Sequence, residues 1–270
     1  MLEYIEILAK ITLEESKFLA SQCHPYVRAV LLSGGLTKNV AMMRELQAVA
    51  AAPDWGAVPA MLVGQSMVGW VPEIPGMMSR FKPPTKTIEE FMSSAADRTA
   101  DLISQIGPSR DTGLDIQAEK KTMDEKKRGV ILGPFPSMKA TGLENASLVP
   151  RRAVWEQHGA ATDVSVRCID DMLSGEQNET VGTVCSHRPT DVDAFVVQSR
   201  AVVDRFPKCK IQAFTSDFAK AYKQCTGRPE DVSKYVIGQW LASSGKIGYF
   251  IAFTLLFGAV PGFEQQCLAQ

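Results

Sequence analysis

The chain has 270 residues, of which 45% are hydrophobic and 22% are charged, the balance of a soluble globular protein of one or two domains. This composition excludes a disordered, collagen-like or coiled-coil chain. The 29 basic and 30 acidic residues give a net charge of −1, so no overall positive field marks the chain as a nucleic-acid binder.

The amino terminus and the cysteines both predict an intracellular protein. The first residues lack the basic and apolar regions of a signal peptide. The six cysteines form no C-x-x-C pair and the three histidines lie far apart, so we expect reduced thiols in the cytoplasm or nucleus rather than a zinc site. The longest apolar run, 249–263, contains Gly258, Pro261 and Gly262 and is shorter than the roughly 20 residues of a membrane span. A buried strand or hairpin, and no membrane partner, is the expectation.

The first 110 residues are predicted to form a helical region, whose role the sequence does not indicate. Apolar residues recur at helical spacing at Ile5, Leu8 and Ile11 and again at Val40, Met43, Leu46 and Val49. Six prolines between residues 53 and 86 exclude long regular elements there. Thr87 and Glu90 form a capping-box pattern, which predicts a helix from Ile88 to Ile106, ended by Gly107 and Pro108.

A charge-dense stretch at 111–128 predicts a solvated helix, and the pattern then changes. Short β-rich runs follow at 130–132, 164–166, 210–214 and 247–251, with a helical pattern at 191–206. We therefore expect an α/β (α+β) fold with two parts, a helical region at 1–110 and an α/β region at 111–270.

The segment 214–224 carries the most chemical information. A β-rich run ends in Asp217, and Ala221 and Tyr222 follow four and five residues later. A carboxylate at a strand end suits Mg²⁺, and an aromatic ring about one and a half helical turns later can form a pocket wall beside it. Taken alone, an aspartate at a strand end is more often a helix N-cap, so the metal interpretation of Asp217 depends on the neighbouring motifs.

Three motifs in order resemble the reverse transcriptase domain of retroelements. The first motif of that family is R-x-x-x-D, followed by a short loop and an Asn. The second motif is D-x-x-x-A-[YF]-x-Q, and the third is L-P-F-G. The matching residues are Arg167, Asp171 and Asn178 for the first, Asp217, Ala221, Tyr222 and Gln224 for the second, and Leu255, Phe257 and Gly258 for the third. Residues 133–136 and the pair Arg151 and Arg152 also look like the start of its fingers. The resemblance covers about residues 115–270 and is nearest to divergent polymerases of dinoflagellates and other protists.

The resemblance implies a partial fingers and palm fold and an RNA-directed DNA polymerase. Such an enzyme adds deoxynucleotides to a primer 3′-hydroxyl by two-metal catalysis, with an RNA template, a DNA primer and dNTPs as partners. It implies that the Asp217 carboxylate and the Phe218 carbonyl bind Mg²⁺.

The same resemblance assigns the nucleotide contacts. Arg167, and less directly Arg152, would bind the triphosphate, a role that suits a planar guanidinium. Tyr222 would lie under the sugar and reject a 2′-hydroxyl. The remaining contacts, with the templating base pair and the nucleotide, would come from Gln224, Phe257 and Gly258. We therefore expect Arg167 and Tyr222 to converge on Asp217, with the turn at Phe257 and Gly258 beside them.

Local charge fits phosphate substrates, although simpler interpretations stay open. Between 205 and 228 there are six basic residues and one acidic residue, Asp217. Such a run is also typical of a solvated surface. For Arg167 a surface ion pair with Asp170 or Asp171 is an equal alternative, and for Tyr222 packing in the core is one.

The chain departs from the family pattern in three places. Leu256 replaces the proline of the third motif, and Ser165 replaces a common lysine two residues before Arg167. The Y-x-D-D motif that completes the metal site is expected after the third motif and is absent from the 270 residues. Asp170 and Asp171 cannot replace it, because they precede Asp217.

Two alternatives to an active polymerase follow, so the sequence leaves open whether the chain is an enzyme. The chain could be an inactive retroelement remnant that binds nucleic acid or a protein partner. It could also be an interaction protein whose functional part is the helical region.

Because one aspartate cannot hold two Mg²⁺ ions, we expect purified 1–270 to extend a primer on an RNA template poorly or not at all. A primer-extension assay with Mg²⁺ and dNTPs measures this. Robust extension would contradict the expectation.

Overall fold

The computed structural model describes residues 2–33, 38–51, 56–71, 78–157, 164–186, 192–208, 210 and 221–259. Within these ranges the fold mixes helices and strands, as the sequence predicted. The helices are α1 (Leu2–Gln22), α2 (Pro25–Leu31), α3 (Val40–Val49), α4 (Ala57–Val63), α5 (Ile88–Ser93), α6 (Ala95–Gln105), α7 (Thr112–Lys127) and α8 (Val192–Arg205). The strands are β1 (Met78–Lys82), β2 (Ile131–Phe135), β3 (Leu148–Gln157), β4 (Val164–Asp170), β5 (Thr183–Ser186), β6 (Val236–Leu241) and β7 (Lys246–Ala252).

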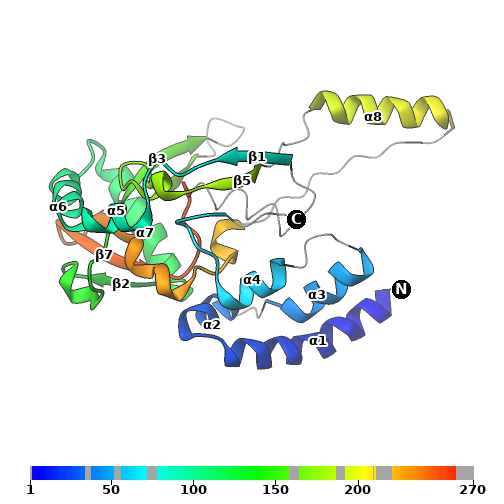
Figure 1. The fold of residues 1–270 in the computed structure, drawn as a ribbon, viewed down its shortest axis with the longest axis horizontal. Coiled ribbons are helices and arrows are strands. Elements are labelled where there is room, and N and C mark those ends of the chain that lie inside the picture. Colours follow the sequence, from blue (N-terminus) through cyan, green and yellow to red (C-terminus); the bar gives the residue numbers. More distant parts are fainter. Residues whose placement is uncertain are drawn as a thin grey trace.

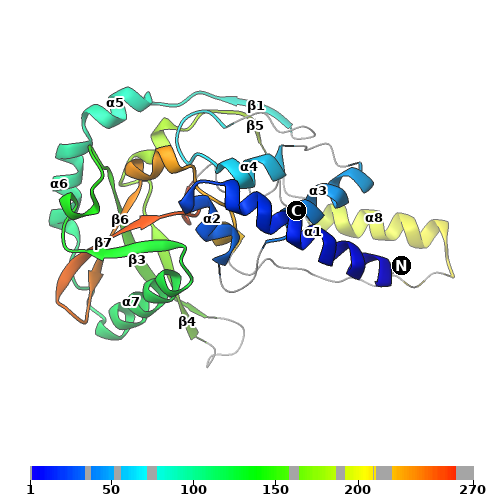
Figure 2. The ribbon, with the colours of Figure 1, turned by 90° about the horizontal axis from the view of Figure 1, so that it is seen from below.

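The main sheet has five strands in the order β2-β7-β6-β3-β4 (Figures 1 and 2). The strands β6 and β7 form an antiparallel hairpin, β3 runs parallel to β6 over Leu148 to Pro150, and β4 pairs antiparallel with β3. Leu148 packs with Leu102 of α6, while its neighbour Val149 faces the main core, against which Met123 of α7 packs. Because adjacent strand residues point to opposite faces, α6 and α7 cover opposite faces of the sheet.

The first four helices form a second apolar cluster beside this sheet. Its buried members come from α1 to α4 and are Ala20, Val27, Leu31, Val40, Val58 and Met61. Tyr26 of α2 stacks on Phe253, just after β7, with ring centroids 4.3 Å apart. The helices are thereby attached to the sheet, whereas α8 lies away from it in both views (Figures 1 and 2).

The helix signals were confirmed with two corrections. Thr87 caps α5, and the capping box with Glu90 is formed. The expected single helix at 88–106 is divided at Ser94 into α5 and α6. The stretch at 111–128 forms α7, capped by Asp111, but it is not wholly solvated, because Ala118 and Thr122 are buried against the sheet.

The strand expectations at 130–132, 164–166 and 247–251 correspond to β2, the start of β4 and β7, and the helix expected at 191–206 corresponds to α8. Residues 211–214 of the fourth β-rich run lie outside the described residues. The sequence pattern did not reveal β1, β3, β5 or β6, and β1 lies within the first 110 residues, which were expected to be helical. In β3 one proline and two adjacent charges (Pro150, Arg151, Arg152) interrupt the apolar pattern that marks a strand.

The two-stranded sheet of β1 and β5 connects the first 110 residues with the rest of the chain. Within the described ranges, no helix is both long enough and apolar enough to cross a membrane.

Candidate functional site

The antiparallel ribbon of β3 and β4 separates two sets of charged side chains. Pairing runs from Arg151 opposite Asp170 to Gln157 opposite Val164. Since directly opposite residues share a face, Arg151 and Asp170 lie together against α7, where both are buried. Arg152 and Arg167 lie on the other face and are exposed. The ribbon therefore has a buried charged face and an exposed basic face.

Arg167 is paired on the exposed face, but not with the partners expected from sequence. Its Nε and Nη2 donate to the carboxylate of Glu156, with Nε 3.1 Å from Oε2. Its Cζ lies 5.3 Å from the ring centroid of Phe257. The alternative of an ion pair with Asp170 or Asp171 is wrong, because those carboxylates pair with Arg151 and Arg152.

Tyr222 and Phe257 come from separate motifs and are in contact. Their ring centroids are 5.4 Å apart in an edge-to-face arrangement of 78°. Tyr222 lies in η4 (Ala221–Gln224) and is half-buried against the main core, so the core-packing alternative holds for part of its surface. Phe257 thus contacts Arg167 as well as Tyr222, while Gln224 at the end of η4 is exposed.

Backbone contacts fix the turn at Phe257 and Gly258. The carbonyl of Phe257 accepts a hydrogen bond of 3.2 Å from the amide of Asp170. The carbonyl of Gly258 accepts one of 3.0 Å from Nδ2 of Asn178. Gly258 has a φ of +111°, and a Cβ there would lie 2.5 Å from the carbonyl oxygen of Asp170. Only glycine fits this close approach, which explains the glycine that ends the third motif.

Arg152 is less constrained than Arg167. Its Nε is 3.5 Å from the Asp171 carboxylate, and its side chain is 62% exposed. The basic run at 205–228 is not gathered at one surface within the described residues. Lys223 points into the buried charged face of the ribbon, and Arg205 ends α8.

The carboxylates near the turn at Phe257 and Gly258 are engaged in ion pairs, and the expected metal ligands are not among the described residues. Asp217 and Phe218, the expected ligands, lie outside the described residues. Nearby Asp170, Asp171 and Glu156 each pair with an arginine. Across the described ranges there is no group of three or more potential metal ligands. No metal step is therefore derived from this geometry.

A buried cluster of four charges holds the segments of the site together. Arg151 binds Asp170 through two hydrogen bonds, Nε to Oδ1 at 2.6 Å and Nη2 to Oδ2 at 3.1 Å. Its Nη1 reaches Glu125 of α7 at 2.9 Å. Lys223, next to Tyr222, lies 3.4 Å from Glu125 and 3.9 Å from Asp170. The two cations and two anions balance, which is the condition for burying them.

This cluster shifts the pKa values of its members. Burial alone would raise the pKa of Glu125, but Lys223 and Arg151 outweigh it and lower that pKa to about 2. Burial alone would lower the pKa of Arg151, but Asp170 and Glu125 raise it above its ordinary value. Sequence reasoning missed Glu125 and Lys223, because only the fold brings α7 and η4 to β4.

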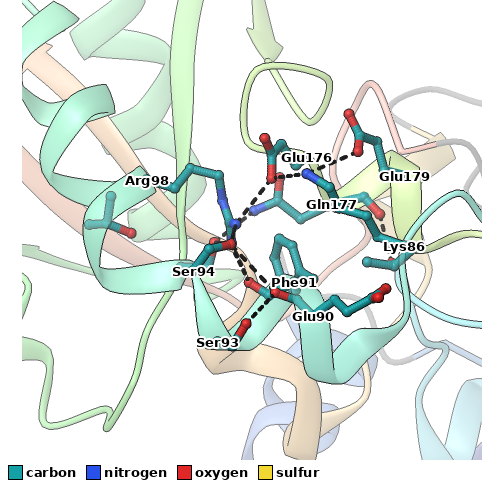
Figure 3. A network of polar contacts seen from close by, with 12 residues as sticks. Lys86, Glu90, Phe91, Ser93, Ser94, Arg98, Glu176, Gln177 and Glu179 are labelled. Carbon is teal, nitrogen blue, oxygen red and sulfur yellow. Dashed lines mark hydrogen bonds and ion pairs between the residues drawn. The ribbon is translucent and has the colours of Figure 1, made fainter.

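A second polar network supports the loop that carries Asn178 (Figure 3). Arg98 of α6 donates to Glu176 at 3.1 Å, to Ser147 and to the Phe91 carbonyl. Lys86 also binds Glu176, at 2.7 Å. Glu176 has a φ of +65°, an unfavourable conformation for a non-glycine residue, which these two cations help to hold.

Comparison with known proteins adds no family assignment. No protein-family model matches the chain, and neither the curated proteins nor the solved structures contain a significant match.

Replacing Arg151 should be costly unless Asp170 is replaced as well. We expect Arg151→Met to lose about 3–5 kcal/mol of unfolding free energy, because it leaves a buried carboxylate without its main partner. The double variant Arg151→Met, Asp170→Leu should recover most of this loss, since Glu125 and Lys223 still balance. Urea unfolding measures both, with Arg152→Met as the exposed neighbouring control. Equal losses for Arg151→Met and Arg152→Met would contradict the role of the cluster.

The depressed pKa of Glu125 predicts a pH dependence of stability. A carboxyl whose pKa is lowered by folding stabilises the protein above its unfolded pKa, and that stability is lost as pH falls toward the folded pKa. Between pH 6 and pH 3 the unaltered chain should lose about 2 kcal/mol more than Glu125→Gln. Urea unfolding at the two pH values tests this, with Glu144→Gln as an exposed control. An equal loss in Glu125→Gln and the unaltered chain would contradict it.

Proposed function

We propose that the described part of 111–270 is the nucleotide-binding side of an RNA-directed DNA polymerase of the reverse transcriptase type. The observation that carries the proposal is the contact of Phe257 with both Arg167 and Tyr222. These three residues belong to three separate motifs, and the family resemblance assigns all of them to one nucleotide. Their contact at one place supports the proposal.

The geometry suits a triphosphate at Arg167. Glu156 takes hydrogen bonds from Nε and Nη2, so it orients the guanidinium and leaves the Nη1 donors for an anion. A guanidinium binds phosphate oxygens through paired, charge-assisted hydrogen bonds. The side chain is 46% exposed, so a ligand can reach it from solvent.

The Tyr222 ring would exclude a bulkier sugar, and we call it the sugar wall. Its ring is held on one side by the main core and edge-on by Phe257, so it cannot yield to a bulkier sugar without moving packed groups. Such a wall would discriminate against a 2′-hydroxyl. Mg²⁺ held by Asp217 and Phe218, and an RNA template with a DNA primer, belong to this proposal through the family resemblance.

Nucleotide binding tests the proposal without requiring turnover. Binding of a fluorescent dNTP in the presence of Mg²⁺ should weaken about 10- to 100-fold in Arg167→Ala, because a charge-assisted hydrogen-bonded contact is lost. The dNTP affinity of Arg167→Lys should lie between those of Arg167→Ala and the unaltered chain. Glu156→Gln should bind at least as tightly as the unaltered chain, since an amide oxygen can still accept from Arg167 while the negative charge beside the bound phosphate is removed. Arg110 is an exposed arginine elsewhere in the chain, and Arg110→Ala should leave the dNTP affinity unchanged.

The sugar wall adds a second readout to the same assay. Tyr222→Ala should bring the affinities for dNTP and rNTP closer together. Equal dNTP affinity in Arg167→Ala and the unaltered chain, or no dNTP binding by the unaltered chain, would contradict the proposal.

A further inference from the structure

A cavity of about 530 Å³ lies on another part of the molecule, between α4, α5 and η5 (Pro229–Lys234). Its wall includes Gln65, Ser66, Trp70, Arg228 and Lys234. It shares no residue with the candidate nucleotide site. The sequence motifs do not account for any of these side chains.

Trp70 lines this cavity, and Phe81 lies beside it with its ring plane tilted by 31°; we call this exposed aromatic pair the platform. Trp70 is 52% exposed and Phe81 of β1 is 71% exposed, and their ring centroids are 5.7 Å apart. Trp70 pairs with Gly182 in a parallel bridge. A Cβ on Gly182 would lie 2.7 Å from the indole ring, so the ring rests directly on the backbone. The platform is therefore fixed in place but open to solvent on one side.

One buried polar atom of the cavity has no hydrogen-bond partner among the described residues. Gln65 is only 7% exposed, and its buried Oε1 accepts no hydrogen bond from any described residue. The backbone of Gln65 is held by hydrogen bonds with the backbones of Thr226 and Arg228, and the residue lines the cavity. A buried acceptor without a partner is costly unless a ligand satisfies it.

Among the described residues, one cation of the cavity has no ion-pair partner. Lys234 is neutralised by Asp231, which also accepts a hydrogen bond from Ser66. Arg228 is exposed and forms no ion pair within the described part of the chain. Arg228 lines the same cavity as Trp70, so its guanidinium is available to an anion bound there.

We propose that this cavity and its aromatic platform bind a single strand of nucleic acid. One base stacks on Trp70 and Phe81, its edge donates to Oε1 of Gln65, and a flanking phosphate binds Arg228. Aromatic stacking combined with a phosphate-binding cation is the usual basis of single-strand binding. A base within a duplex cannot stack on the platform, because both of its faces are already covered.

Fluorescence anisotropy with a labelled 12-nucleotide single strand, as RNA and as DNA, tests the proposal on the full chain. Trp70→Leu and Phe81→Ala should each weaken binding at least about fivefold. Arg228→Ala should reduce the slope of log affinity against log salt by about 0.7. Gln65→Leu should reduce the differences in affinity among homopolymers. Phe18→Ala and Arg110→Ala are the matched exposed controls and should bind as the unaltered chain does.

Three results would overturn the proposal. The first is unchanged strand affinity in Trp70→Leu when circular dichroism shows its fold intact. The second is displacement of the strand by a duplex as readily as by a single strand. The third is binding of a free mononucleotide without binding of the strand.

The two proposals fail separately. Arg167→Ala should leave strand binding intact, and Trp70→Leu should leave dNTP binding intact.

Discussion

The buried ion pair between Arg151 and Asp170 is the constraint on which the candidate nucleotide site depends. Asp170 ends β4 and holds the turn at Phe257 by its backbone amide, while its carboxylate binds Arg151 on β3. Glu125 and Lys223 complete the charge balance and connect α7 and η4 to the same point. Because unpaired charges are costly to bury, these segments are held in one arrangement. The exposed face of the ribbon therefore presents Arg167 in a fixed position relative to Tyr222.

The first 110 residues contribute to this arrangement from the other side. Arg98 and Lys86 hold Glu176 in its left-handed conformation, and Asn178 two residues later holds Gly258. The aromatic platform depends on the same loop, because Trp70 rests on Gly182. One loop thus supports both candidate sites, while the chemistry of each lies on different side chains. A variant of the loop should affect both sites together.

Sequence reasoning was most successful where the signal is local. The caps at Thr87 and Asp111 lie within one helical turn of the amides that they bind, so the pattern alone predicts α5 and α7. Motif offsets selected Arg167, Tyr222 and Phe257, which are in contact, together with Asp217, which lies outside the described residues. Nothing in the sequence indicated that Arg151 is buried while Arg152 is exposed, because that depends on the register of β3 with β4. The aromatic platform likewise depends on distant segments meeting.

The central claim is that Arg167, Tyr222 and Phe257 surround one nucleotide. A crystal structure of the chain with a non-hydrolysable dNTP analogue and Mg²⁺ tests it most directly. We predict the triphosphate within hydrogen-bond distance of the Arg167 guanidinium and the sugar against the Tyr222 ring. A triphosphate bound elsewhere, with Arg167 paired only to Glu156, would contradict the claim.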